Sequence, residues 1–365
     1  MADQVRVGLI GTSYWADQLH LPAVASHDAG TVVAICGRDR ERAELLAEKY
    51  GVPSVYTDYQ AMIDRARLDA VIVATPEDLH HPMTMAALKA GKHVLCEKPM
   101  ARTAAQSQEM LTAAEAANVK HMVQFTNRGL PHYRYIKEVV DDGYVGQPYH
   151  AYFYWPTGWF PAEEVNSYHW AFDARRANGA VNELGAHMID LARWYLGEVV
   201  RVSATLRNFV PHLDQDGTPM ENANDSAFLL LDFASGAHGV VHVGSPNIAS
   251  DDLNHTGQVA IISGSEGTLE SRGDPWTSPP ISEIRGLRRG AASAETLTIP
   301  NAYFGGSDPN DVFQVFQSQS IGPRLFIDAI IQDLAISPNF SDGHQVQRII
   351  DAALESDLTN AAQLI

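Results

Sequence analysis

A lysine, a glutamate and a histidine carry much of the potential for chemistry in this 365-residue sequence. Lys98 directly follows a short apolar run, HVLCE, and precedes a proline. Glu183 and His187 are four residues apart, so on a helix they would share a face. A partly desolvated lysine and a histidine can both exchange protons near neutral pH. These residues suit a reaction that moves a proton on and off a substrate group.

Each of these residues also has a structural alternative. Lys98 could simply pair with Glu97 on the surface, and His187 could be a hydrogen-bonded core histidine. Asp190, three residues after His187, is expected to orient the imidazole rather than to react. No cysteine or second histidine lies at ligand spacing from this group, so we predict no metal site.

The first apolar run, Val5–Ile10, leads into a glycine turn that suits a dinucleotide. The turn, GTSYWA, resembles the pattern G-x-G-x-x-G/A with a serine at the second glycine. The first glycine allows a tight turn, and the following helix N-terminus favours the pyrophosphate. The alternative is an ordinary strand–turn–helix. The loop residues expected to contact a nicotinamide cofactor are Gly11, Thr12, Ser13, Tyr14 and Trp15.

The end of the second predicted strand bears on the choice between NADP and NAD. An acidic residue there would bind the ribose hydroxyl of NAD, whereas an arginine would favour the 2′-phosphate of NADP. The ribose-facing position is expected to be Gly37, and Arg38 follows it. NADP is therefore favoured over NAD. In the alternative, Arg38 is a solvated surface charge and Asp39 caps the next helix.

The elements that must position these residues alternate along the first third of the chain. Short apolar runs separated by amphipathic segments indicate βαβ units and a parallel sheet. The predicted strands are Val5–Ile10, Thr31–Cys36, Ala70–Ala74, His93–Cys96 and Lys120–Phe125. The predicted helices are Arg40–Tyr50, Pro82–Ala90 and Thr103–Ala117. We expect a Rossmann domain over residues 1–126.

From about Tyr149 the candidate strands follow one another, which indicates a mainly antiparallel sheet with helices on one face. The predicted strands are Tyr149–Trp155, Val200–Asn208, Ala227–Phe233, His238–Gly244, Gln258–Ser263 and Thr268–Ser271. The predicted helices are Glu183–Leu196, Arg324–Ala335 and Gly343–Leu354. We expect an irregular stretch over Gly273–Asn310 and a second α/β domain over residues 127–365.

The sequence resembles the Gfo/Idh/MocA oxidoreductases over nearly its whole length. The resemblance is carried by the glycine loop, by ATPEDLHHPMTMAALKAGKHVLCEKPMA at 74–101 and by GAVNELGAHMIDLARWYLGE at 179–198. FIDAIIQ and FSDGHQVQRIIDAALES near the C-terminus also match. Glu-Lys-Pro after the HVLC strand is the most specific part. The resemblance implies a Rossmann domain and an α/β domain with an open, mostly antiparallel sheet, whose face often mediates dimers or tetramers.

The resemblance also implies roles for individual residues. Lys98 and His187 match the catalytic or substrate-binding pair, and Glu183 stands where the family usually has aspartate. A cis bond is expected before Pro99. Further cofactor contacts are expected from Thr75, Pro76, His80, Glu97 and Lys98.

The substrate implied by the family is a sugar, a polyol or a related hydroxy-carbonyl compound, oxidised or reduced by hydride transfer. Aromatic faces suit the apolar side of a sugar ring. These aromatic residues could equally be core or interface filler. The residues expected to shape the pocket are Asn127, Arg128, Trp155, Trp159, His169, Trp170 and His187. Two rival functions are an NAD-dependent glycoside hydrolase and a dinucleotide-binding regulator without turnover.

Composition restricts the partners. With 26 basic and 44 acidic residues the net charge is −18, which disfavours nucleic acid and anionic membranes. No apolar run approaches the ~18 residues of a membrane helix. Cys36 and Cys96 each end an apolar run and read as reduced core residues. Without a visible secretory signal, we expect a cytoplasmic homo-oligomer that binds a small molecule.

Overall fold

The computed structural model describes residues 4–158, 168–246 and 257–365, and within it the chain forms two compact units. Unit 1 comprises Met1–Gly129, Gly305–Ser307 and Phe313–Gln347; unit 2 comprises Leu130–Phe304, Asp308–Val312 and Arg348–Ile365. The first boundary thus lies three residues from the predicted one. The later segments differ from the prediction, which assigned everything after residue 126 to one domain.

The return of the chain to unit 1 has a hydrophobic cause. Helix α9 (Pro323–Gln332) buries Phe326, Ile327 and Ala329 in the same core cluster as strand residues Val7 and Leu95. Burying one such side chain contributes roughly 1.5–3 kcal/mol. The apolar face of α9 therefore attaches this late segment to the first sheet.

Unit 1 is built on a six-stranded parallel sheet in the order β3-β2-β1-β4-β5-β6, the order of a Rossmann domain. Its strands are β1 (Val5–Ile10), β2 (Gly30–Cys36), β3 (Val55–Tyr56), β4 (Ala70–Val73), β5 (His93–Glu97) and β6 (His121–Gln124). Every strand predicted in this region is present, with ends that differ by at most one residue. The short strand β3 was not predicted.

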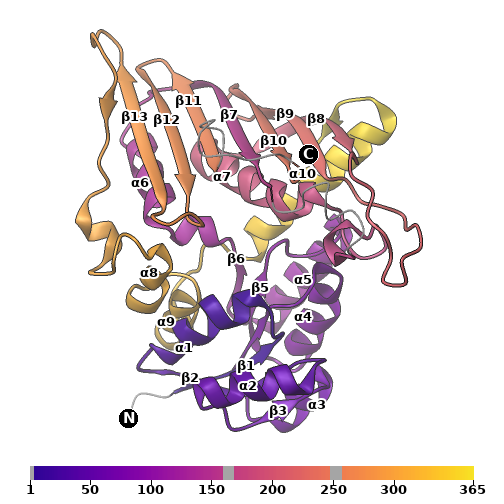
Figure 1. The fold of residues 1–365 in the computed structure, drawn as a ribbon. Coiled ribbons are helices and arrows are strands. Elements are labelled where there is room, and N and C mark those ends of the chain that lie inside the picture. The colour runs from indigo at the N-terminus through magenta and orange to yellow at the C-terminus, as the bar shows by residue number, and fades with distance from the viewer. Residues whose placement is uncertain (1–3, 159–167, 247–256) are drawn as a thin grey trace. The chain divides into compact units, whose positions relative to one another are not determined.

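Helices connect these strands (Figure 1). They are α1 (Leu21–Ala25), α2 (Arg40–Tyr50), α3 (Tyr59–Arg65), α4 (His80–Lys89) and α5 (Ala104–Ala117), together with a π-helix, η1 (Ala16–His20), and 3₁₀ turns η2 (Glu77–Leu79) and η3 (Thr126–Gly129). Asp39, Asp58 and Thr103 cap α2, α3 and α5 by accepting backbone N–H bonds. Helix α3 was missed because its seven residues are too few for a clear helical period.

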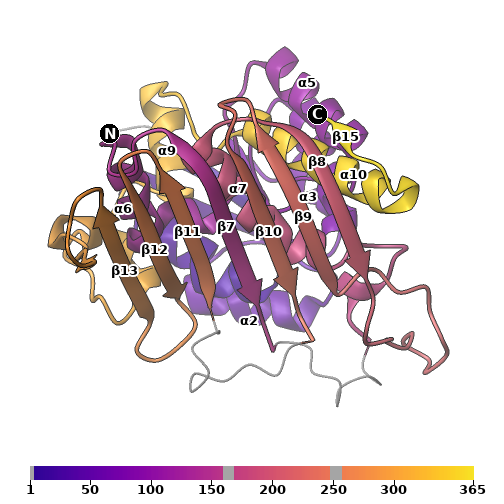
Figure 2. The same cartoon turned by 90° about the horizontal axis from the view of Figure 1, so that it is seen from above.

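Unit 2 contains a nine-stranded sheet in the order β14-β13-β12-β11-β7-β10-β9-β8-β15 (Figure 2). Its strands are β7 (Pro148–Pro156), β8 (Val199–Arg207), β9 (Ser226–Phe233), β10 (His238–Gly244), β11 (Gln258–Gly264), β12 (Gly267–Asp274), β13 (Ile281–Arg288), β14 (Glu295–Thr296) and β15 (Gln363–Leu364). Neighbours pair antiparallel except β7 with β10. The predicted open, mostly antiparallel sheet is confirmed.

Two helices of unit 2, α6 (Pro131–Asp141) and α7 (Ala186–Leu196), lie on the same face of this sheet (Figure 1). Phe153 of β7 stacks on Tyr195 of α7 with 6.3 Å between ring centroids. The Tyr195 hydroxyl donates to the backbone oxygen of Tyr133 in α6 at 3.2 Å. This bond ties the two helices together beneath the strands.

The remaining helical segments are mostly short. They are η5 (Trp170–Phe172), the π-helix η6 (Val181–Gly185), η8 (Asn301–Phe304), η9 (Val312–Gln314), α8 (Val315–Ser318) and α10 (Phe340–Thr359). Helix α10 begins in unit 1 and continues into unit 2. It is 20 residues long and exceeds the predicted Gly343–Leu354 at both ends.

The stretch predicted to be irregular, 273–310, contains two strands, and that prediction is wrong for β13 and β14. In β13 only Ile284 and Gly286 are buried, so the sequence lacks a clear alternation of apolar and polar residues. The strand forms because its backbone pairs with β12 along the whole of its length. The turn predicted at Ser235-Gly236 does join β9 to β10, with Gly236 at φ +87°.

Both cysteines are free and buried, as the sequence predicts. Burial raises the pKa of Cys36 to about 11 and raises that of Cys96 as well. Neither thiol is suited to act as a nucleophile at neutral pH. No described helix has both the length and the apolar character that crossing a bilayer requires.

Candidate active site

The glycine loop after β1 is shaped by a close approach of two chain segments. Gly11 has φ +117°, and a Cβ atom there would lie 2.0 Å from the backbone oxygen of Ala74, just after β4. The Gly11 amide donates to the Cys36 oxygen at the end of β2. Only glycine fits this position, and a dinucleotide fold requires such a turn at the carboxyl edge of the sheet.

The next loop residues differ from the glycine pattern in a way that the structure explains. The hydroxyl of Ser13 accepts a hydrogen bond from the Ala16 amide at 3.3 Å, so it satisfies an N–H group at the start of η1. Tyr14 is exposed, and its ring meets Trp15 edge-on at 5.6 Å. The Trp15 ring lies 6.2 Å from Phe313, which also belongs to unit 1. A contact of these loop residues with a cofactor pyrophosphate stays a prediction.

The residues expected to distinguish NADP from NAD lie just after β2. Gly37 has no room for a carboxylate, because a Cβ atom there would lie 2.6 Å from Thr12 Cγ2. Arg38 is exposed. The carboxylate of Asp39 accepts the Arg42 amide at 3.1 Å as the α2 cap. The acidic side chain that follows Arg38 in the sequence is thus engaged as the cap of α2.

His80 connects the loops that follow β4 and β5. Its Nδ1 lies 2.7 Å from the oxygen of Pro99, and its Nε2 lies 2.8 Å from the oxygen of Thr75. Both partners only accept, whereas a neutral imidazole has a single N–H to donate. Burial lowers the pKa of His80, and the two carbonyl contacts oppose that shift. The structure gives His80 a positioning role; a direct cofactor contact by His80, Thr75 or Pro76 stays a prediction.

Glu97, at the end of β5, is buried and held from two sides. Its Oε1 lies 2.8 Å from Nε2 of His20, a fully buried residue of η1, and its Oε2 accepts the Lys98 amide at 3.2 Å. The alternative of a surface pair between Glu97 and Lys98 is excluded by this burial. His20 could not be found from the sequence, because no motif links it to a residue 77 positions later.

Lys98 itself is partly exposed, and the bond between it and Pro99 is cis, as expected. Asn127 is buried in η3. Arg128 donates to Ser337 at 3.1 Å and to Asp342 at 3.4 Å. Arg128 therefore has a structural role at the start of α10, and its predicted contact with substrate stays a prediction.

In unit 2, His187 lies at the start of α7 beside the end of β7. Its ring meets Trp155 edge-on with 5.7 Å between centroids, and both side chains are buried. Asp190, one turn later, is also buried. The preceding segment with Glu183 is the π-helix η6, a rare element that often occurs at functional sites.

His169 and Glu183 form a second group in unit 2. Nδ1 of His169 accepts the Ala171 amide at 3.3 Å, and its ring lies 5.7 Å from Trp170. Burial lowers the pKa of His169, and the nearby negative charge of Glu183 partly opposes this. Trp159 lies outside the described residues.

The predicted residues thus gather into local groups. Unit 1 holds the glycine loop, the Thr75 and Lys98 loops and their braces; unit 2 holds the pairs Trp155–His187 and His169–Glu183. Among the described residues no group of three His, Cys, Asp or Glu side chains could hold a metal ion. The arrangement combines a dinucleotide turn with proton-carrying side chains.

Such a combination is typical of nicotinamide-dependent oxidoreductases. Residues 5–125 match the oxidoreductase family with an NAD-binding Rossmann fold, and residues 133–270 match the GFO/IDH/MocA C-terminal domain. The chain therefore belongs to the Gfo/Idh/MocA family of NAD-binding oxidoreductases.

Relatives agree with this assignment. The chain is 29% identical over 340 residues to levoglucosan dehydrogenase of Pseudarthrobacter phenanthrenivorans, covering 87% of this chain and 85% of that protein. It is 30% identical over 266 residues to D-apiose dehydrogenase of Paraburkholderia graminis, covering 73% and 67%. The structure of levoglucosan dehydrogenase with NADH and levoglucosan superposes with a TM-score of 0.87 at 25% identity and covers all of both chains.

The first prediction follows from the geometry of the glycine loop and concerns cofactor affinity. Gly11→Ala places a methyl group against the Ala74 oxygen, which cannot yield without moving β4, so NADH affinity should fall about tenfold or more. Fluorescence titration of the variant with NADH measures this.

Gly51→Ala is the matched control. Gly51 also has positive φ, +67°, but nothing lies within 4 Å of a Cβ atom there. This variant should lose about 1 kcal/mol of stability and keep its NADH affinity. Unchanged binding by Gly11→Ala would contradict the assignment of the loop.

Proposed function

We propose that this protein transfers a hydride between a nicotinamide dinucleotide and a hydroxyl-bearing carbon of a sugar or polyol. The observation that carries the proposal is the placement of Lys98. It follows a strand end that is fixed by a buried His20–Glu97 contact, and it lies on the same sheet as the glycine turn. Relatives named for levoglucosan, D-glucoside and inositol oxidation support a carbohydrate or polyol substrate.

The chain's own residues supply binding and proton transfer. The bound nicotinamide supplies a hydride acceptor or donor. The turn at Gly11 and the start of η1 hold the pyrophosphate. His187 removes the hydroxyl proton as a general base, and Lys98 orients the same hydroxyl and balances its charge. The reverse assignment of these two roles is the alternative.

Supporting residues keep these groups in place. Trp155 restricts the His187 ring by its edge-on contact. We propose that Asp190, three residues later, orients the imidazole and that Glu183 supports the site from the preceding π-turn. Asn127, His169 and Trp170 contribute to the binding of substrate hydroxyls and the apolar ring face. The nearly complete burial of His187 and Trp155 shields the reacting group from bulk water.

The second prediction concerns the effect of the proposed catalytic pair, Lys98 and His187, on kcat. Lys98→Ala and His187→Ala should each lower kcat by about 10²–10⁴-fold, because each removes a proton-transfer or charge-balancing group. Cofactor affinity should stay close to that of the parent, since neither residue belongs to the glycine loop. Glu183→Ala should have a smaller effect. Steady-state kinetics with a turned-over sugar and a parallel cofactor titration measure these effects.

Two surface variants serve as controls for this experiment. Lys89→Ala and His81→Ala change the same residue types on α4 and should keep the parent's kcat. If Lys98→Ala and His187→Ala also retain it, the proposed catalytic pair is wrong.

For the cofactor we propose a preference for NADP. The support is the absence of a carboxylate at Gly37, the exposed guanidinium of Arg38, and the engagement of Asp39 as a helix cap. The structure of levoglucosan dehydrogenase named above carries NADH. A preference for NADP would therefore distinguish this chain from that relative.

The third prediction tests this preference. Arg38→Ala should weaken NADP binding about tenfold, because a charge-assisted bond to the 2′-phosphate is lost, and should leave NAD binding unchanged. Arg40→Ala is the control, since Arg40 pairs with Glu44 on α2. Calorimetric titration of the parent and both variants with both cofactors measures the six affinities. Tighter binding of NAD by the parent would refute the proposed preference.

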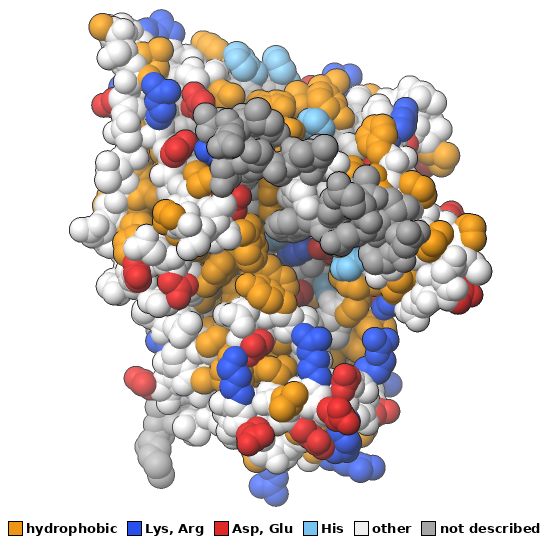
Figure 3. Space-filling model, in the orientation of Figure 1, with side chains coloured by type: hydrophobic (Ala, Val, Ile, Leu, Met, Phe, Trp, Pro, Cys, Tyr) orange, Lys and Arg blue, Asp and Glu red, His pale blue; other side chains and the backbone are white. Residues whose placement is uncertain are grey.

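We further propose a homo-oligomer formed through the outer face of the unit 2 sheet. On β9, Phe228 and Leu230 are 42% and 53% exposed, while the alternate residues Leu229 and Leu231 are buried. The ring of Phe228 lies beside that of His242 on β10, with 5.3 Å between the ring centroids. Figure 3 shows histidine and hydrophobic side chains together along the upper margin of this unit. Such an apolar patch is typical of an interface between subunits.

The fourth prediction concerns this face. Leu230→Arg should convert the oligomer to a monomer, because the buried charge would have no partner at the interface. Leu45→Arg, at an exposed leucine on α2, is the matched control and should leave the mass unchanged. Light scattering coupled to gel filtration gives the mass of each. A monomeric parent would contradict the proposal.

A further inference from the structure

The π-helix η6, which carries Glu183 and leads into the helix of His187, begins where two distant chain segments come close together. Gly179, just before η6, has φ +72°, and a Cβ atom there would lie 2.0 Å from the backbone oxygen of Asn224. A side chain at Gly179 would collide with the backbone of the other segment, so this turn requires glycine.

Asn224 holds the turn with three hydrogen bonds. Its backbone oxygen accepts the Ala180 amide at 2.8 Å, and its side-chain Oδ1 accepts the Val181 amide at 3.0 Å. Its Nδ2 donates to the backbone oxygen of Asn178 at 2.5 Å. The side-chain amide therefore uses one acceptor and one donor, and both are directed at the backbone around the start of η6.

These bonds give η6 a cap from a distant part of the chain. The first amides of a helix have no partner within it, and a polar side chain at the N-cap commonly accepts one of them. The N-cap residue here is Ala180, which has no polar side chain. Asn224 takes that role, although it lies 43 residues after Val181. The direction in which η6 begins is therefore set by Asn224.

The neighbouring residue connects the same segment to the turn that follows His169. The amide of Ala223 donates to the backbone oxygen of Phe172 at 2.8 Å. The ring of Phe172 lies 6.1 Å from that of His169. Residues 223 and 224 thus bond to two segments with candidate residues, one with His169 and one with Glu183.

Asn224 is itself fixed by the residue that follows it. Asp225 is buried, and its Oδ2 accepts the amides of Phe209 and Val210 at 2.8 and 2.7 Å. Its backbone oxygen accepts the amide of Ser245, directly after β10, at 2.9 Å. Strand β9 begins one residue later. The turn before η6 is therefore attached to the sheet through Asn224.

We propose that Asn224 is a positioning residue, which fixes the start of η6 to the sheet and thereby places His187 for proton transfer. The proposal rests on the proposed function for the role of His187. His187 is the second residue of α7, which continues directly from η6. A general base must reach the proton within hydrogen-bond distance, and a displacement of about 1 Å can lower the rate about 100-fold.

The test removes both side-chain hydrogen bonds and leaves the backbone contact in place. Asn224→Ala should lower kcat about 10–100-fold and leave NADH affinity unchanged, because the glycine loop belongs to the other unit. In the His187→Ala background the same substitution should lower kcat by less than about twofold, since it acts through a residue that is no longer there. Steady-state kinetics of the parent, the two single variants and the double variant measure this.

A conservative variant gives a pH-dependent rescue that a general loss of stability would not. In Asn224→Asp a protonated carboxyl group can accept the Val181 amide and donate to the Asn178 oxygen, whereas the ionised group only accepts. The facing carbonyl oxygen raises the pKa of this carboxyl above its usual ~3.9. Relative to the parent at the same pH, kcat should therefore be highest in acid and fall as the pH rises to neutral.

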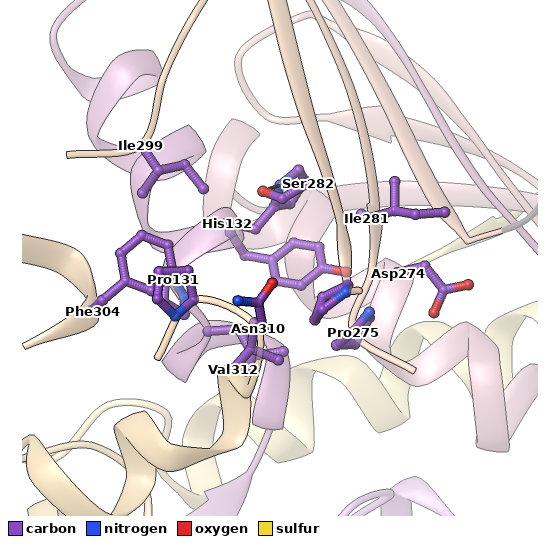
Figure 4. Close-up of a pocket in the computed structure, with 15 residues that line it drawn as sticks. Pro131, His132, Asp274, Pro275, Ile281, Ser282, Ile299, Phe304, Asn310 and Val312 are labelled. Carbon is purple, nitrogen blue, oxygen red and sulfur yellow. Dashed lines mark hydrogen bonds between the residues drawn. The ribbon is translucent and has the colours of Figure 1, made fainter. Parts of the chain in front are cut away.

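Two asparagines of the same unit serve as controls. Asn208→Ala removes bonds from Nδ2 to the oxygens of Val210 and Ala223, and Asn310→Ala removes a bond to Asp308. Figure 4 shows Asn310 among the residues that line a pocket of about 220 Å³ beside the start of α6. Neither side chain bonds to the turn before η6, so both variants should keep the parent's kcat.

Hydrogen exchange tests the contact without turnover. The Val181 amide should exchange about tenfold or more faster in Asn224→Ala than in the parent and the controls. Unchanged exchange, an unchanged kcat, an equal loss of kcat in the His187→Ala background, or a pH-independent ratio for Asn224→Asp would overturn the positioning role. A failure of the proposed function would appear separately, as unchanged kcat in Lys98→Ala and His187→Ala.

Discussion

The buried contact between His20 and Glu97 is the interaction on which the geometry of the first unit depends. It joins the helix that follows the glycine loop to the end of β5, and the other oxygen of the same carboxylate holds the Lys98 amide. Removing one partner of a buried hydrogen bond typically costs about 1–3 kcal/mol. Together with the His80 brace between the Thr75 and Pro99 oxygens, it fixes the loops after β4 and β5 relative to the cofactor turn.

In the second unit, contacts between aromatic side chains and a hydrogen bond between helices hold the candidate residues in place. Its helical layer joins α6 to α7 through Tyr195, and the end of β7 brings Trp155 to His187. The helix with His187 begins as a π-turn, just as the helix after the glycine loop does. A π-turn adds a residue to the helical repeat and so redirects the side chains that follow. Each unit thus places its candidate residues at an irregular helix start.

The features that could be predicted from the sequence are those whose interacting residues lie close together along the chain. Buried parallel strands are continuous apolar runs, so β1, β4 and β5 were predicted within a residue or two, and Gly11 followed from its position. The strand β13 was missed because only Ile284 and Gly286 are buried and its pairing depends on β12. His20 was missed because its partner, Glu97, is distant in sequence. Arg128 was predicted as a pocket residue, but its hydrogen bonds to Ser337 and Asp342 were not, because those two residues return from the C-terminal segment.

The central claim, net hydride transfer between a carbohydrate and a nicotinamide, is tested most directly with a substrate deuterated at its hydroxyl-bearing carbons. Oxidised cofactor and the labelled sugar or polyol are incubated with the protein, and the cofactor is then analysed by mass spectrometry. The account predicts one deuterium in the reduced cofactor and an equal amount of ketone or lactone product. Cleavage of a glycosidic bond without net labelling of the released cofactor would contradict it and favour an NAD-dependent glycoside hydrolase.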